Sequence, residues 1–144
     1  MKRVFLDANI YFAAAGSPNG GSALILSLAK KDKIKTVTVY HALAEAERNI
    51  GNKLGSEYLL NHYKNILSSQ PDIQSLDSLT LETILRMENF LPAKDIPILA
   101  GAILSKAHVL LTLDKKDFLN NQKLKNTKLP FEILNPEKFL QKYF

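Results

Sequence analysis

Short apolar runs alternate with longer stretches of helical character along the chain. The short runs are rich in β-branched and aromatic residues, which predicts strands at 2–6, 35–40, 72–74, 108–113 and 131–134. The longer stretches repeat their apolar residues at helical spacing, which predicts helices at 22–31, 41–52, 56–67, 80–90, 96–106 and 136–143. Because strands and helices alternate, we expect right-handed crossovers between parallel strands.

The expected fold class is α/β, with three layers (α/β/α) around a central, mostly parallel sheet. Residues 108–113 read HVLLTL, a continuous apolar run of the kind found inside parallel sheets. Residues 96–106 are apolar on nearly every side, so this helix should be buried. The chain has 144 residues and neither an internal repeat nor a low-complexity tract, so we expect a single domain over 1–144.

The composition excludes several classes of protein. There are no cysteines, which excludes a disulfide scaffold, a zinc ribbon, an iron–sulfur cluster and a thiol nucleophile. No apolar run approaches the roughly 18 residues of a membrane span, and Asp7 ends the first apolar stretch too early for a secretory signal. The dinucleotide-binding, P-loop and serine-hydrolase motifs are absent. We expect a soluble, cytoplasmic protein.

Charge is distributed unevenly along the chain. The net charge of +5 comes from 19 Lys and Arg residues against 14 Asp and Glu residues. Residues 1–40 and 115–144 each carry a net charge of +4, whereas residues 41–114 carry −3. A basic envelope around an acidic centre suits an enzyme that acts on a polyanion, although ordinary solubility charge gives the same composition.

Five carboxylates fall where predicted strands end or predicted helices begin. Asp7 and Asp114 end strands, and Asp117 follows in the turn after Asp114. Glu45 lies about one turn into the helix after the second strand, and Asp95 directly precedes the apolar helix. In a parallel sheet these positions share one edge, at which open α/β sheets bind their ligands. We therefore expect the carboxylates to converge there.

A bound cation would explain such a cluster, because carboxylates on one edge repel each other without one. Oxygen ligands without His or Cys favour Mg²⁺ or Mn²⁺ over zinc. Ordinary structural roles are also open to single acids: Asp95 as a helix N-cap, and Asp114 and Asp117 as turn residues. The adjacent Tyr11 and Phe12 are expected in the core rather than on a base-stacking platform.

Four segments resemble the sequence motifs of PIN-domain ribonucleases. VFLDANI at 4–10 resembles the opening motif, and LAEAERN at 43–49 resembles the second, in which a glutamate opens a helix. KDIPILAGA at 94–102 is similar to the third motif, and LTLDKKDF at 111–118 is similar to the fourth. The order and spacing of the motifs agree over essentially the whole chain.

The resemblance implies an endoribonuclease that hydrolyses RNA phosphodiester bonds with Mg²⁺ or Mn²⁺, often as the toxin of a VapBC-type toxin–antitoxin pair. It assigns the metal-binding and catalytic acids to Asp7, Glu45, Asp95 and Asp114. Supporting roles, by hydrogen bonding or auxiliary ligation, are implied for Asn9, Thr112 and Asp117. RNA contacts are expected from Lys115 and Lys116. The expected partners are the RNA substrate, a cognate antitoxin and a second copy of the chain in a homodimer.

Several alternatives stay open at the level of the sequence. Glu45 and Glu47 lie two residues apart on one predicted helix and so on different faces, and the motif favours Glu45. A PIN-like module can bind RNA or protein without cutting, and a PIN nuclease can process RNA without being a toxin. A phosphatase acting on small phosphoesters would use the same metal but would not need the basic flanks.

Overall fold

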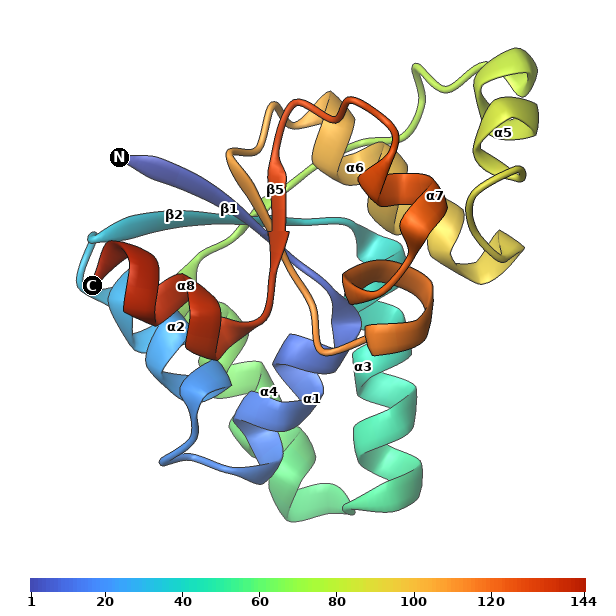
Figure 1. The fold of residues 1–144 in the computed structure, drawn as a ribbon. Helices are drawn as coiled ribbons and strands as arrows, with labels where there is room; N and C mark the ends of the chain where they lie inside the picture. The colour runs from blue at the N-terminus through green and yellow to red at the C-terminus, as the bar shows by residue number, and fades with distance from the viewer.

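The computed structural model describes residues 1–144 and contains one five-stranded sheet (Figure 1). The strands are β1 (Lys2–Leu6), β2 (Ile34–Thr38), β3 (Asp72–Ile73), β4 (Val109–Leu111) and β5 (Glu132–Leu134). They lie in the order β3-β2-β1-β4-β5, and every neighbouring pair is parallel. The predicted α/β fold with a parallel sheet is confirmed.

Helices cover both faces of this sheet, which confirms the three-layer arrangement. They are α1 (Ala8–Gly16), α2 (Gly21–Lys30), α3 (Tyr40–Lys53), α4 (Ser56–Ser69), α5 (Leu81–Met87), α6 (Ile96–Leu104), α7 (Gln122–Lys125) and α8 (Pro136–Tyr143). A short 3₁₀ helix, η1 (Ala93–Asp95), precedes α6, and a π-helical turn, η2 (Lys115–Leu119), follows β4. Figure 1 shows α1–α4 and α8 on one side of the sheet and α5–α7 on the other. No helix is both long enough and apolar enough to cross a membrane.

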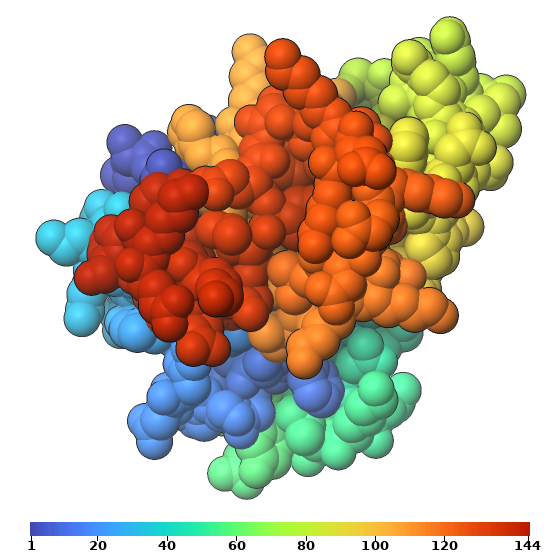
Figure 2. All heavy atoms as spheres, in the orientation of Figure 1, coloured from blue at the N-terminus to red at the C-terminus, as the bar shows by residue number.

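The core lies between the sheet and both helical layers, where 31 buried apolar residues form one cluster. Helix α6 packs tightly against the sheet at Gly101. A Cβ added there would lie 2.6 Å from Val39 Cγ1 and 2.8 Å from Phe5 Cε2, so this contact needs glycine. Figure 2 shows α5 and its flanking segments, in yellow-green, projecting at one corner of the molecule.

Two helices have no counterpart among the predicted elements. Helix α1 lacks the expected helical periodicity because it is apolar and buried on several sides, at Ala8, Ile10, Tyr11, Ala14 and Ala15. Helix α7 has four residues, which is too short for a periodic pattern. Strand β4 is shorter than predicted, because its pairing with β1 ends where Leu6 meets Leu111.

Candidate metal-binding active site

The C-terminal ends of β1 and β4 open into a cavity of about 190 Å³, here called the acidic cavity. Asp7 directly follows β1, Asp114 follows β4, Glu45 comes from α3, and Asp95 ends η1 just before α6. All four line this cavity, so the structure brings together the acids predicted as metal ligands. Figure 1 shows the end of β1 beside α3 and the orange turn η2 at this edge.

Hydrogen bonds hold the buried Asp7 carboxylate from three sides. Its Oδ1 accepts a hydrogen bond from the Ala8 amide at 2.7 Å, which caps α1. Its Oδ2 accepts from Thr112 Oγ1 at 2.7 Å and from Asn9 Nδ2 at 3.2 Å. The Asn9 side-chain oxygen accepts from the Leu113 N–H at 2.9 Å. Asn9 and Thr112 therefore tie the end of β1 to the end of β4 and fix the orientation of Asp7.

Burial raises the pKa of Asp7 above its ordinary value, because the carboxylate loses solvation. Hydrogen bonds from Thr112 and Ala8 act in the opposite direction, while the nearby charges of Glu45 and Asp114 raise the pKa further. A carboxylate that is desolvated, held in place and surrounded by other acids is stabilised in its charged form by a nearby cation.

A second group of acids lies on the α6 side of the acidic cavity. Carboxylate oxygens of Asp95, Asp114 and Asp117 lie within 4.8 Å of one another. Asp114 Oδ1 accepts a hydrogen bond from the Asp117 amide at 2.9 Å, which caps η2. Asp95 occupies the N-cap position of α6, but its side chain makes no capping hydrogen bond. Capping therefore accounts for one role of Asp114 and for none of Asp95.

Lys94 places a positive charge among these acids. Its Nζ lies 3.0 Å from Asp95 Oδ2 and 3.4 Å from Asp117 Oδ2. Partial burial opposes the charged form of Lys94, but its hydrogen bonds and ion pairs with the two acids outweigh burial and raise its pKa. Burial, reinforced by the charge of Asp117, raises the pKa of Asp95 to about 6 despite the ion pair with Lys94. Lys94 therefore offsets only part of the cost of burying the Asp95 charge.

These residues fit a divalent cation bound through oxygen. The converging ligand atoms are carboxylate oxygens, which Mg²⁺ and Mn²⁺ prefer. No histidine lines the acidic cavity, so the ligand set does not suit zinc. The Lys94 ammonium group already lies between two of the acids, which shows that this arrangement accommodates a cation.

The structure separates Glu45 from Glu47 on α3. Glu45 lines the acidic cavity, whereas Glu47 is exposed and accepts a hydrogen bond from Tyr63 Oη of α4 at 2.6 Å. Asn49 and Lys53 also line the acidic cavity, one and two turns beyond Glu45. These two residues are not among the predicted site residues, although the four-residue spacing of 45, 49 and 53 is a signal for one helix face.

Some of the aromatic and basic side chains near the acids line the acidic cavity, and others do not. Tyr11 is buried in the core as predicted, but Phe12 is only half-buried and lines the acidic cavity. Lys53 Nζ lies 5.8 Å from the centre of the Phe12 ring. Lys115 and Lys116 are exposed on η2, and the structure brings neither into the lining of the acidic cavity.

The sheet order, with helices on both faces, defines a PIN-like α/β fold. A chain in the crystal structure of VapBC2 from Rickettsia felis, bound to a DNA fragment from their promoter, has the same fold. The two chains superpose with a TM-score of 0.67 and 19% sequence identity, over 92% of this chain and 98% of that chain. No model of a known protein family and no curated protein matches the sequence. The resemblance to PIN domains is confirmed at the level of the fold.

Proposed function

We propose that the protein is an endoribonuclease that uses Mg²⁺ or Mn²⁺ to hydrolyse RNA phosphodiester bonds. The observation that carries this proposal is the convergence of four acids, from distant positions in the chain, on one cavity at the C-terminal edge of a PIN-like sheet. Such edges are where open α/β sheets bind their ligands. Local capping does not require all of these carboxylates to meet.

The acids would have different roles in binding the metal ion. Asp95 and Asp114 would bind it, with Asp117 as the auxiliary ligand, because their oxygens already lie within 4.8 Å of one another. Asp7 and Glu45 complete the set, and hydrogen bonds keep the Asp7 carboxylate in one orientation. A metal ion bound there supplies a water of lowered pKa and offsets the charge that develops on the phosphate.

Positive and aromatic side chains around the acidic cavity would hold the RNA strand. Lys53 lines the cavity and would pair with a phosphate, and Phe12 offers a partly exposed ring on which a base can stack. Lys115 and Lys116 follow Asp114 directly, are exposed and form no ion pairs, so they are the next candidates for phosphate contacts. The net charge of +5 favours binding of a polyanion.

We further propose that the protein is the toxin of a type II toxin–antitoxin pair and that it forms a homodimer. Its support is the fold shared with a chain of the VapBC2 structure. A cognate antitoxin would inhibit the enzyme by placing a basic side chain among the carboxylates, in the manner in which Lys94 already contacts Asp95 and Asp117. Binding of such a side chain would compete with the metal ion for the same oxygens.

Incubation of a mixed RNA pool with the protein in Mg²⁺, Mn²⁺ or EDTA tests the nuclease proposal. We expect RNA fragments with either ion, none in EDTA, and no phosphate release from p-nitrophenyl phosphate. RNA binding without cleavage in all three conditions would identify a non-catalytic module instead. Phosphate release from the small ester without RNA cleavage would identify a phosphatase.

Growth after expression of the chain alone separates a toxin from an RNA-processing nuclease. Expression should slow growth, and Asp7→Asn should relieve the effect. Equal inhibition by both forms would contradict the toxin proposal while leaving the nuclease proposal intact. Metal-dependent cleavage in vitro with no effect on growth would favour an RNA-processing role.

A further inference from the structure

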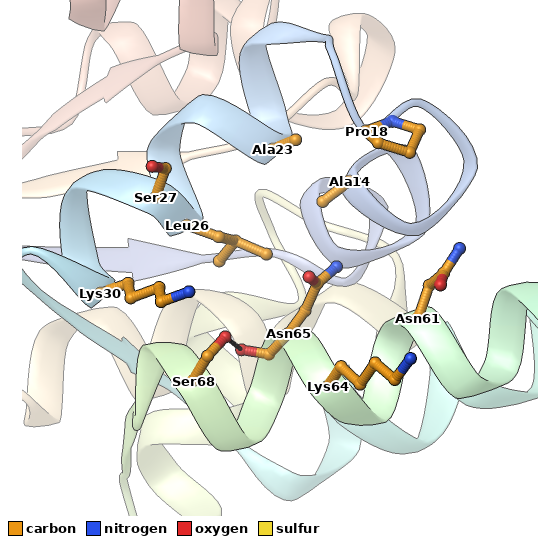
Figure 3. Close-up of a pocket in the computed structure, with 10 residues that line it drawn as sticks. All are labelled: Ala14, Pro18, Ala23, Leu26, Ser27, Lys30, Asn61, Lys64, Asn65 and Ser68. Carbon is orange, nitrogen blue, oxygen red and sulfur yellow. Dashed lines mark hydrogen bonds between the residues drawn. The ribbon is translucent and has the colours of Figure 1, made fainter.

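A second cavity, of about 310 Å³, lies between α1, α2 and α4 and is here called the α2–α4 cavity (Figure 3). Helix α1 contributes Phe12 to the acidic cavity and Ala14 to the α2–α4 cavity. These two positions are about 200° apart around the helix axis. The two cavities therefore lie on different sides of α1, and no residue lines both.

The polar lining of the α2–α4 cavity comes from two helices and contains no acid. Helix α2 supplies Ser27 and Lys30, and helix α4 supplies Asn61, Lys64 and Asn65. Figure 3 shows Lys30 extending from α2 towards α4, and both asparagines extending from α4 towards α1 and α2. The cavity thus combines two ammonium groups with two amides.

These polar groups have no partners within the protein. Neither Lys30 nor Lys64 belongs to any of the ion pairs of the chain. Among the residues drawn in Figure 3, the single hydrogen bond runs from Ser68 Oγ to the main-chain oxygen of Asn65. The Asn65 amide, the Asn61 amide and both ammonium groups are therefore free to bind a ligand.

The chemistry of the lining favours a ligand with an anionic end and a partly apolar end. Two ammonium groups without a neighbouring acid create a positive potential that favours an anion. Ala14 and Leu26 are buried and provide an apolar wall on the α1–α2 side. Amides on the α4 side offer paired hydrogen-bond donors and acceptors, which match the edge of a nucleobase.

We propose that the α2–α4 cavity binds a nucleoside phosphate. The phosphate pairs with Lys30 and Lys64, because lysine binds phosphate as a point charge. The base lies against the apolar wall and presents its edge to Asn61 or Asn65. The cavity volume of about 310 Å³ is at the low end of the roughly 300–1,000 Å³ typical of small-molecule sites, which suits a single nucleotide. The nucleotide comes either from free nucleoside monophosphates or from the phosphorylated end of an RNA strand.

The inference does not rest on the proposed nuclease activity, because no residue of the acidic cavity takes part. Binding is therefore measured in EDTA, which removes any metal-bridged phosphate from the acidic cavity. A protein that cuts RNA and binds no nucleotide, or that binds a nucleotide and cuts no RNA, distinguishes the two proposals.

NMR titration of the isotope-labelled full chain with AMP, GMP, CMP, UMP, the matched nucleosides and inorganic phosphate tests the inference. We expect at least one monophosphate to bind and to shift the amide resonances of Ser27, Asn61 and Asn65. Its nucleoside should bind roughly tenfold more weakly, because hydrogen bonds to a charged group are lost. Added salt should weaken binding of the monophosphate.

Matched variants assign the binding to the lysines of the cavity. Lys30→Gln and Lys64→Gln should each weaken binding roughly tenfold. Lys123→Gln makes the same charge change at an exposed position on α7 and should leave the dissociation constant unchanged within error. Asn65→Leu should remove the preference for a nucleotide over inorganic phosphate, and an unchanged thermal midpoint verifies the fold of each variant.

An RNA trinucleotide with a 5′-phosphate, compared with its 5′-hydroxyl form, distinguishes the two sources of the ligand. Displacement of the mononucleotide by the phosphorylated form alone identifies an RNA end, and no displacement by either identifies a free nucleotide. The inference is overturned if no monophosphate binds or if the shifts cluster at the acidic cavity. It is also overturned if Lys123→Gln weakens binding as much as Lys30→Gln, or if a short glutamate peptide displaces the nucleotide at equal concentration, which would identify an acidic protein segment as the ligand.

Discussion

Asp7 and Tyr11 are four residues apart and both buried, but their polar atoms have very different surroundings. The Asp7 carboxylate accepts hydrogen bonds from three neighbouring groups, including the Thr112 hydroxyl at 2.7 Å. The Tyr11 hydroxyl has no hydrogen-bond partner, and neither has Nδ1 of the buried His62. The Tyr11 and His62 rings instead meet edge to face, with their centres 5.9 Å apart.

The difference separates a buried polar group that the fold supplies with hydrogen-bond partners, Asp7, from one that it buries without them, Tyr11. An unpartnered buried hydroxyl costs about 1–3 kcal/mol, and an aromatic edge-to-face contact offsets about 0.5–1.5 kcal/mol of that cost. A buried carboxylate costs more unless it is paired and hydrogen-bonded. Three donors around Asp7 therefore mark a position where the charge itself is needed, whereas Tyr11 and His62 contribute by packing.

Replacement of Asp7 by Asn should have the largest effect on activity. The amide keeps the shape of the side chain but removes its charge, so RNA cleavage should fall by more than the roughly 10- to 100-fold typical of residues that only support a metal ligand. Removal of the buried charge should stabilise the metal-free protein, whereas the amide nitrogen replaces an oxygen that accepts from at least one of the three donors. The two effects oppose each other, so the unfolding temperature without metal should change little. Single-turnover cleavage at fixed Mg²⁺ and thermal unfolding followed by circular dichroism measure both quantities.

Glu47→Gln is the matched control for this experiment, because Glu47 is exposed and contacts Tyr63 outside the acidic cavity. Its cleavage rate should stay close to that of the wild type, whereas Glu45→Gln should lose most of the activity. Full activity in Asp7→Asn would contradict the catalytic interpretation. If Glu47→Gln lost activity while Glu45→Gln retained it, the functional glutamate of the second motif would be Glu47 and not Glu45.

Two buried threonines test whether the hydrogen bonds around Asp7 matter in themselves. Thr112→Val removes the donor to Asp7 Oδ2 and the acceptor for the Asp114 amide. We expect a loss of roughly 10- to 100-fold in cleavage and of about 1–3 kcal/mol in the free energy of unfolding. Thr36→Val makes the same change at an equally buried threonine whose hydroxyl has no partner, so it should cost neither activity nor stability. Equal effects at both positions would show that only the packing of the threonines matters.

The positions of the acids could be predicted from the sequence because strand ends determine them. Asp7 and Asp114 directly follow apolar runs, and parallel strands put such positions on one edge. Helix α1 could not be predicted, because a helix buried on several sides carries no apolar–polar period. Lys30 and Lys64 lie on separate helices, and only the tertiary packing of α2 and α4 brings both to one cavity.

The position of the Lys94 side chain among the acids could not be predicted from the sequence either. A lysine beside an aspartate has many conformers in which the two side chains point apart, and 60% of the Lys94 side chain is exposed. Its contact with Asp117 depends on how η2 packs beside η1, which no local pattern determines. The predicted metal ligands are all acids, whereas the structure places two lysines, Lys53 and Lys94, in the lining of the same cavity.

Lys94→Gln tests how this internal cation affects metal binding, with a moderate expected effect. Without the ammonium group, Asp95 and Asp117 lose their counter-ion, so the metal-free protein should unfold at a lower temperature. The Mg²⁺ concentration for half-maximal thermal stabilisation should fall roughly two- to fivefold, in line with a partly exposed ion pair. Lys123→Gln is the control for a change in net charge. An unchanged or higher Mg²⁺ requirement in Lys94→Gln would show that Lys94 does not compete with the ion.

Replacement of His62 should have the smallest effect of these changes. The effect should be seen in how the free energy of unfolding depends on pH. Burial lowers the pKa of His62 below its ordinary value of 6.5, although the charge of Glu47 acts in the opposite direction. Below about pH 6.5 the unfolded chain binds a proton that the folded histidine resists, so stability is lost as the pH falls through this range. Urea unfolding at about pH 7 and about pH 5 should therefore show a smaller loss of unfolding free energy in His62→Gln than in the wild type.

Tyr11→Phe separates this titration from the packing of the two rings. The variant keeps the edge-to-face contact and removes only the unpartnered hydroxyl, so its unfolding free energy should rise by up to about 1 kcal/mol. It also keeps His62, so its loss of stability between the two pH values should equal that of the wild type. A pH dependence that His62→Gln leaves unchanged would assign the titration to other groups. A loss of stability in Tyr11→Phe would show that the hydroxyl has a partner, such as a buried water, and that the contrast with Asp7 is one of degree.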